Sequence, residues 1–375
     1  MYTKPYLPGL TSLRFFAAAI VVLDHGNYNM EKFGLFSNDH IFFNRGFEAV
    51  TFFFVLSGFL ITYLLLTEYE QTSTISIRTF YEKRVKRIWP LYFLIVVFGL
   101  ILYNLLFPFA GIAYSVNYEV ESIVWLYVFF LANMAYSFFN TGGILAVTWS
   151  IGIEEQFYLV WAPFVKRNIK NLVRGLWLVY IFWVVVQVVN DLSIFNLGPG
   201  WGKFIGTMQF HCMALGALGA YYVYHHKEKV INLAVFKNRF LQWGVLLSLL
   251  VIFLAWDFGI PRFVFMQVLP MLFLWLILDT SINPKPLLHS EKKSLIHLGT
   301  VSYGVYMFHY IMVYIFTMLG TKATWFFKEY TVLAPIIYYV LVFGTTVLVA
   351  SVSFKYFETY FLKKKQFLPR FKTVD

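Results

Sequence analysis

Two ionisable residues near the N-terminus have a spacing that suits joint chemistry inside a membrane. Arg14 and His25 are eleven positions apart in one apolar run, residues 10–25. On a helix they differ by about 20° from three full turns, so they share one face and lie about 16 Å apart. Ionisable groups at membrane depth are costly and indicate a functional site. The alternative is that Arg14 snorkels to the interface and His25 only marks the helix end.

A second pair of basic residues is suited to a phosphorylated ligand. Arg84 and Arg87, in FYEKRVKRIWPLY, are three positions apart and therefore lie on one helix face. Guanidinium groups bind phosphate through paired hydrogen bonds. Pro90 is typical of a helix start, and helix N-termini attract anions. The alternative is that these arginines only anchor the helix at the cytoplasmic surface.

Two adjacent carboxylates, Glu154 and Glu155, lie in TWSIGIEEQFYLVW, a segment too apolar for a solvated loop. A carboxylate here can orient a histidine or hold a sugar hydroxyl, and the alternative is a simple ion pair with a nearby arginine. His309, in SYGVYMFHY, is more typical of a buried core histidine than of a catalytic one. Ser57 and Gly58 in FFFVLSGFLI are more typical of helix packing than of a nucleophilic site. The single cysteine, Cys212, excludes a disulfide framework and a multi-cysteine metal site, and we predict no metal.

These residues require helices that cross a membrane. The chain has 375 residues, of which 59% are hydrophobic and 13% are charged, whereas soluble domains carry about 25% charged residues. A water-soluble enzyme is therefore excluded. We predict a single all-α transmembrane domain over residues 1–375, with apolar segments near 10–25, 47–66, 88–107, 122–139, 147–165, 175–190, 205–224, 240–256, 263–280, 297–318 and 333–354.

The basic residues predict the orientation of these segments. The net charge is +11, and 23 of the 30 Lys and Arg fall in the chain ends and one set of loops, against 6 in the opposite loops. Cytoplasmic loops are rich in Lys and Arg, so we predict that both termini are cytoplasmic. The excess positive charge is then explained by the orientation of the chain in the membrane, so we predict no nucleic-acid partner.

The same distribution creates a parity problem. The basic stretches 78–87 and 166–174 must share one side, yet three apolar segments separate them. One of these segments therefore cannot cross fully, and we favour 147–165, because polar residues interrupt it. Broken backbone at membrane depth is tolerated where protein or a water-filled cavity covers it. We thus expect about ten transmembrane helices plus one re-entrant or partial helix.

Five stretches of the sequence resemble the membrane-bound acyltransferase-3 family, whose members O-acylate glycans. They are LPGLTSLRFFAAAIVVLDH, GFEAVTFFFVLSGFLI, FYEKRVKRIWPLY, TWSIGIEEQFYLVW and SYGVYMFHY, and they occur in the family's order across most of the chain. Two positions depart from the family pattern. Lys83 stands where a further Arg is common, which would loosen donor binding, and Ala49 stands where Gly is frequent.

The resemblance implies an enzyme that moves an acyl group, commonly acetyl, from acyl-CoA at the cytoplasmic side to a hydroxyl of a cell-surface or lipid-linked carbohydrate. No cofactor would be bound permanently, since acetyl-CoA is the donor substrate. The expected location is the bacterial inner (plasma) membrane. Many relatives carry a soluble esterase-like domain after the membrane unit. This sequence ends at Asp375, so such a domain would be a separate periplasmic or extracytoplasmic partner, or absent.

In the mechanism that the resemblance implies, His25 is the catalytic histidine and Arg14 the essential buried arginine. His25 would take the proton of the acceptor hydroxyl, and Arg14 would orient the thioester or stabilise the oxyanion. Glu155, slightly favoured over Glu154, or Asp24 would orient the imidazole. Arg84, Arg87 and Lys83 would bind coenzyme A, and Trp149, Gln156 and His309 are candidate substrate-binding residues.

Two points remain open from the sequence. Transfer can proceed directly or through an acyl-histidine. The rival class is a secondary transporter or flippase of a glycan or lipid-linked precursor, which also has many spans and buried charges.

Overall fold

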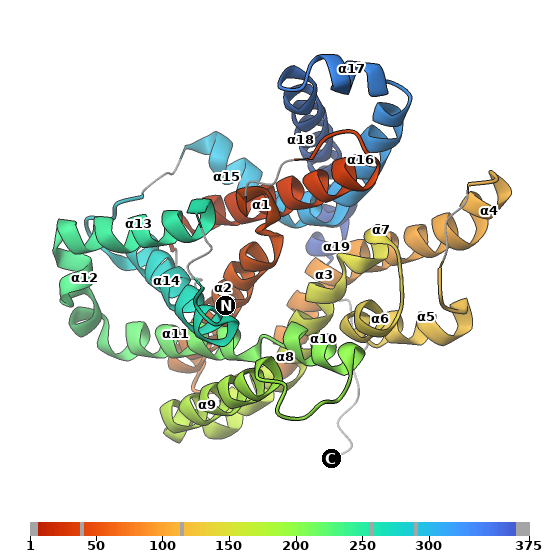
Figure 1. Ribbon diagram of the computed structural model, residues 1–375. Helices are drawn as coiled ribbons and strands as arrows, with labels where there is room; N and C mark the ends of the chain where they lie inside the picture. The colour runs from red at the N-terminus through yellow and green to blue at the C-terminus, as the bar shows by residue number, and fades with distance from the viewer. Residues whose placement is uncertain (1–6, 38–40, 113–115, 256–258, 289–291, 365–375) are drawn as a thin grey trace.

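The computed structural model describes residues 7–37, 41–112, 116–255, 259–288 and 292–364, and in these ranges every regular element is helical. Figure 1 shows α1 and α2 in the interior, with α16–α18, α11–α14 and α4–α7 grouped around them. The helices are α1 (Leu10–Lys32), α2 (Gly46–Thr72), α3 (Ile77–Ile101), α4 (Phe107–Phe109), α5 (Val120–Val128), α6 (Ala132–Phe138), α7 (Gly143–Ala146), α8 (Trp149–Asn168), α9 (Leu172–Asp191), α10 (Pro199–Thr207), α11 (Phe210–Ile231), α12 (Ala234–Lys237), α13 (Arg239–Ala255), α14 (Arg262–Ile282), α15 (Lys293–Thr300), α16 (Ser302–Thr321), α17 (Thr324–Glu329), α18 (Leu333–Ser353) and α19 (Thr359–Lys363), with 3₁₀ turns at Ile41–Asn44 and Ile169–Asn171 and π turns at Leu102–Leu106 and Phe354–Glu358.

Among the described residues, 6 helical stretches are long and apolar enough to cross a membrane. One of them, Gly143–Asp191, has 49 residues and contains both α8 and α9, each about one bilayer core in length. The helices α1, α11 and α13 fall outside this set, because polar and charged residues lower the hydropathy of α1 and α11 and the apolar part of α13 is short. An integral membrane protein is therefore confirmed, while the count of ten crossings stays a prediction. The chain ends that we expect in the cytoplasm, residues 1–6 and 365–375, lie outside the described residues.

Small residues allow the central helices to approach closely. A Cβ atom added at Gly58 of α2 would overlap the backbone carbonyl of Met213 on α11, and one added at Gly216 would overlap that of Val55. Helix pairs in membranes commonly pack through such small residues. The packing interpretation of the Ser57–Gly58 segment is thus confirmed for Gly58.

The broken segment is not the one that we favoured from the sequence. The α8 helix runs through its 20 residues without a break, so the interruption expected within 147–165 is absent, and the extent to which this segment crosses the membrane stays a prediction. The interruption lies instead between α5 and α6, where Phe130 has a left-handed φ of 57°. The two ends of this segment meet, because the backbone N–H of Asn140 donates to the side chain of Asn117. Residues 118–139 therefore begin and end close together, which is the arrangement expected of a re-entrant segment.

Side chains from neighbouring helices satisfy the backbone at this break. The Gln156 amide on α8 donates to the Phe130 carbonyl over 2.8 Å and to Asn133 Oδ1 over 2.9 Å. The Tyr92 hydroxyl on α3 donates to the Tyr127 carbonyl over 3.0 Å. Gly152 lets α8 approach, since a Cβ there would lie 2.7 Å from the Phe130 carbonyl oxygen. Gln156, predicted to bind substrate, thus holds the break together.

Candidate active site

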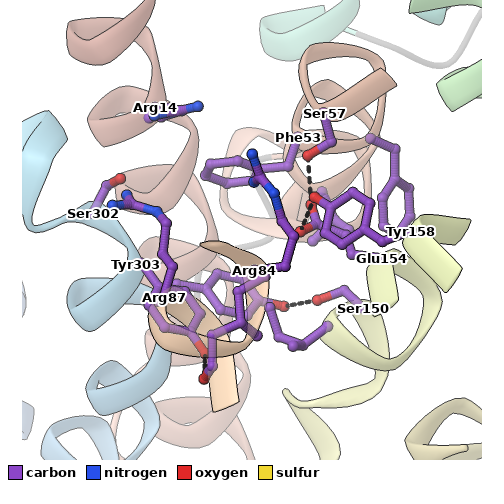
Figure 2. Close-up of a pocket in the computed structure, with 15 residues that line it drawn as sticks. Arg14, Phe53, Ser57, Arg84, Arg87, Ser150, Glu154, Tyr158, Ser302 and Tyr303 are labelled. Carbon is purple, nitrogen blue, oxygen red and sulfur yellow. Dashed lines mark hydrogen bonds between the residues drawn. The ribbon is translucent and has the colours of Figure 1, made fainter. Parts of the chain in front are cut away.

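Three arginines from two helices line one buried cavity, which we call the arginine cavity. Arg14 comes from α1, and Arg84 and Arg87 come from α3 (Figure 2). The cavity has a volume of about 110 Å³, and α2, α8 and α16 complete its wall. The predicted shared face of Arg84 and Arg87 therefore holds, and it brings both residues to Arg14.

The charges around the arginine cavity favour an anion. Three guanidinium groups line it, but Glu154 is the carboxylate among its lining residues. That carboxylate already accepts hydrogen bonds from the Ser57 hydroxyl over 2.8 Å and from the Tyr158 hydroxyl over 2.9 Å. Within the described part of the chain, the buried Nε of Arg84 has no hydrogen-bond partner. A buried donor left unpaired is costly, so this cavity is suited to an acceptor-rich anion such as phosphate.

The position of the arginines on α3 corrects one prediction. The helix begins at Ile77, because the Ser76 side chain caps the backbone N–H of Thr79. Arg84 and Arg87 thus lie in the second and third turns, and Pro90 lies inside the helix rather than at its start. The helix N-terminus is therefore not available to a ligand in the arginine cavity, and side chains must supply the binding. Lys83 is exposed and does not line the cavity.

A second and larger cavity surrounds His25, and we call it the histidine cavity. Its volume is about 700 Å³, and its wall mixes polar and aromatic side chains, among them Asp24, His25, Tyr136, Trp149, Lys203 and Tyr310. The Trp149 ring is stacked with Phe47 at 5.9 Å and with Tyr136 at 6.0 Å between centroids. A cavity of this size falls in the range of ligand pockets, and its many polar side chains suit a polar ligand. Trp149 thus shares a cavity with His25, but its ring is buried and already packs against Phe47 and Tyr136, so its role in substrate binding stays a prediction.

His25 forms a hydrogen-bonded pair with His309. Its Nδ1 lies 2.7 Å from Nε2 of His309, and the two rings are nearly parallel, with centroids 5.0 Å apart. The other nitrogen of His309, Nδ1, lies 2.5 Å from the Tyr306 carbonyl oxygen. A carbonyl only accepts, so Nδ1 of His309 carries the proton and its Nε2 accepts from His25. The lone pair of His25 is thereby placed on Nε2.

The glutamates that we expected to orient His25 are held elsewhere. Glu154 belongs to the arginine cavity, and Glu155 accepts a 2.8 Å hydrogen bond from the Trp89 indole. The carboxylate near the imidazole is that of Asp24, whose Oδ2 lies 3.9 Å from Nε2 of His25. The hydrogen-bond partner of the ring is thus His309, and Asp24 is the nearby charge. The 284-residue separation of the two histidines explains why spacing did not reveal the pair.

Two helices connect the two cavities. On α1, Arg14 lines the arginine cavity and His25 the histidine cavity; on α16, Ser302 and Tyr306 line the first and Tyr310 the second. Tyr306 stands between them. Its hydroxyl is 2.8 Å from the Ser150 hydroxyl and donates to the Val147 carbonyl over 3.1 Å. Because Ser150 lines the arginine cavity and Val147 the histidine cavity, the Tyr306 side chain contacts the walls of both.

Long apolar helices with charged cavities buried among them define a polytopic membrane protein with an internal site. The chain belongs to the acyltransferase-3 family, because the model of that family's acyltransferase domain matches residues 7–355. This membership confirms the resemblance and does not favour the transporter alternative. No solved structure matches the chain.

Curated relatives agree with this assignment. The chain is 25% identical to the peptidoglycan O-acetyltransferase OatA of Listeria monocytogenes, covering 99% of the chain and 58% of the relative. It is 27% identical to the O-acetyltransferase OatA of Staphylococcus aureus, covering 100% and 60%. It is 34% identical to the putative peptidoglycan O-acetyltransferase YrhL of Bacillus subtilis, over 42% of the chain and 24% of the relative. The chain thus spans about three fifths of the length of the two OatA relatives.

Proposed function

We propose that the protein is a membrane O-acyltransferase that moves an acetyl group from acetyl-CoA to a hydroxyl of a cell-envelope carbohydrate. The observation that carries this proposal is the arrangement of a cationic cavity and a histidine cavity at two levels of the same helices, α1 and α16. Family membership supports the acyltransferase class, and the names of the relatives support acetyl transfer to an envelope polysaccharide.

The arginine cavity would receive the phosphates of the donor. Arg84 and Arg87 have the geometry for bidentate contacts with phosphate, and Arg14 adds a third positive charge. Because Arg14 lies with this pair and about three helical turns from His25, we assign it to donor binding rather than to the oxyanion. The pantetheine arm would then extend past Tyr306 toward His25. Lys83, which is exposed, would contribute at most long-range attraction.

The chemical step would take place in the histidine cavity. The acceptor hydroxyl donates its proton to Nε2 of His25 while its oxygen attacks the thioester carbonyl. The carbon–sulfur bond of the tetrahedral intermediate then breaks, the coenzyme A sulfur leaves as thiolate, and the imidazolium returns the proton to it. The products are the acetyl ester and free coenzyme A. Asp24, at 3.9 Å from Nε2, stabilises the imidazolium between the two proton transfers.

The sidedness follows from the basic loops. With the basic loops inside, the arginine cavity opens toward the cytoplasm, where acyl-CoA is made, and the histidine cavity opens toward the outer side of the bacterial plasma membrane. An acceptor carbohydrate would therefore be modified outside the cell, alone or through an extracytoplasmic partner protein.

Purified protein incubated with labelled acetyl-CoA and a panel of envelope glycans tests this proposal. We expect label in a glycan with wild-type protein and none above background with His25→Ala. The His25→Ala protein should retain thermal stabilisation by coenzyme A, because His25 does not line the arginine cavity. Transfer by His25→Ala at the wild-type rate would contradict the assignment of His25 as the base. If no acyl-CoA stabilised the protein, the assignment of acyl-CoA as the donor would be wrong.

A further inference from the structure

The histidine cavity continues into a third cavity, which we call the Arg262 cavity. Its volume is about 750 Å³, close to the 700 Å³ of the histidine cavity. Asn44, Tyr136 and Lys203 line both cavities, which therefore adjoin at these three side chains, and we call the two cavities together the groove. Ligand pockets for drug-sized molecules have about 300–1,000 Å³, so each half of the groove is large enough for at least one sugar unit.

A fixed cation stands at this junction. The Lys203 ammonium donates a 2.8 Å hydrogen bond to the Tyr136 carbonyl and lies 3.5 Å from the centre of the Tyr136 ring. Of the carboxylates that the structure describes, none lies within 4.0 Å of this ammonium. Partial burial lowers the pKa of Lys203, because part of the water around its charge is displaced. An anion in the groove would restore the lost stabilisation.

The other cations of the Arg262 cavity already have carboxylates. Arg45 pairs with Glu48 over 2.9 Å, and Arg262 pairs with Asp191 over 3.9 Å. The histidine cavity has one further cation, Lys32, whose ammonium lies 5.8 Å from the centre of the Tyr28 ring. Beside His25 itself, the Asp24 carboxylate would repel an anion from the reacting position. A negative group on a ligand is therefore favoured at the junction and disfavoured at the catalytic histidine.

We propose that the acceptor is an oligosaccharide of at least two units, with its reacting hydroxyl at His25 and a carboxylate of the neighbouring unit at Lys203. This inference rests on the proposed function and names its substrate class. Lys203 is on this account a specificity residue: it sets the affinity for the acceptor and leaves the chemical step unchanged. The rest of the chain occupies the Arg262 cavity, where Phe47 and Tyr136 offer aromatic surface.

Two tetrasaccharides with the same backbone provide the test. One is the neutral tetramer of N-acetylglucosamine, and the other is a peptide-free peptidoglycan tetrasaccharide, in which every second sugar bears a lactyl carboxylate. We expect wild-type protein to bind and acetylate the carboxylated tetramer with a Kd and KM about tenfold lower, as one charge-assisted hydrogen bond provides. In Lys203→Met the Kd and KM for the carboxylated tetramer should rise to the values for the neutral tetramer, while kcat should stay within about twofold of the wild-type value.

Two further variants separate recognition from folding and from general charge. Lys203→Arg should keep the preference, while Lys322→Met, which removes an exposed lysine outside the groove, should leave all constants unchanged. Equal binding of the two tetramers by wild-type protein, binding of neither, or an unchanged preference in Lys203→Met would overturn the inference. Because binding is measured without donor, a carboxylate preference without acetyl transfer would count against the proposed function and not against the Lys203 site.

Discussion

Nδ1 of His25 and Nε2 of His309 lie 2.7 Å apart, so two histidines from α1 and α16 form one hydrogen-bonded unit. The Tyr306 carbonyl fixes the proton on Nδ1 of His309, and this in turn fixes the proton on Nδ1 of His25. The result is a His25 whose basic nitrogen, Nε2, is directed away from the pair. In catalytic histidines the group that binds the second ring nitrogen commonly sets the tautomer in this way.

The first prediction concerns His309 as a positioning residue. His309→Leu keeps a buried side chain but removes the acceptor, so His25 loses its fixed tautomer. We expect kcat to fall by about 10²–10⁴-fold, the usual contribution of a positioned acid–base group, with little change in the KM for donor. His309→Gln, whose amide oxygen can accept from Nδ1 of His25, should recover part of kcat. Steady-state kinetics of both variants decide the point, and wild-type kcat in His309→Leu would reduce His309 to a packing residue.

The second prediction separates the two arginines of α3 from the lysine beside them. Arg84→Met should raise the donor KM by about 10–100-fold, the range for a lost hydrogen bond to a charged group, while kcat changes less. Arg87→Met should behave alike, because both residues line the arginine cavity. Lys83→Met is the matched control, since Lys83 is exposed and does not line it.

The readouts for this prediction are the donor KM and the thermal shift caused by coenzyme A. The shift should shrink in each arginine variant and vanish in the double variant, and it should be unchanged in Lys83→Met. An unaltered donor KM in Arg84→Met would return that residue to a role in membrane anchoring.

Spacing along single helices was the part of the site that could be predicted. The shared face of Arg14 and His25, and that of Arg84 and Arg87, follow from helix geometry alone, and the structure places each pair on one continuous helix. The partner of His25 could not be predicted in this way. It depends on how α1 packs against α16, and no local pattern distinguishes His309 from a buried core histidine.

The odd number of apolar segments between two basic stretches predicts a partial helix, and the backbone break lies between α5 and α6 rather than in α8. The polar residues of α8 suggested a break in that segment. The Gln156 amide instead donates to Asn133, 23 residues away, and to the Phe130 carbonyl, 26 residues away, at the break between α5 and α6. A polar side chain in an apolar segment indicates that a polar group nearby requires a hydrogen-bond partner. Whether that group lies in the same segment or in a neighbouring one depends on the tertiary structure.

The third prediction tests that contact. Gln156→Ala would leave the Phe130 carbonyl without the Gln156 donor inside the bundle, and we expect a loss of about 1–3 kcal/mol in the free energy of unfolding. Asn168→Ala is the control. Both residues are half-buried, but the Asn168 amide bonds only its own helix, over 2.9 Å to the Phe164 carbonyl, so its loss breaks no contact between helices. Thermal unfolding in detergent should show a clearly larger drop in Tm for Gln156→Ala, and equal drops would contradict the role of Gln156.

The fourth prediction concerns topology, which thiol labelling in intact cells can decide. The chain has a single cysteine, Cys212, and it is buried with 0% exposure, so the background should be low. Glu119→Cys and Asn140→Cys introduce thiols at exposed positions near the two ends of the α5–α6 segment. Because the Asn140 backbone bonds to Asn117, both thiols should react with a membrane-impermeant reagent from outside.

Lys170→Cys places a thiol at an exposed position between α8 and α9, on the expected cytoplasmic side. If α8 crosses the membrane completely, this thiol should react only after permeabilisation. Labelling of Glu119→Cys and Asn140→Cys from different sides would mean that residues 120–138 cross fully, and the basic loops 78–87 and 166–174 could then share a side only if α8 did not cross. Lys170→Cys would in that case react from the same side as Asn140→Cys, so the three variants together distinguish the two topologies.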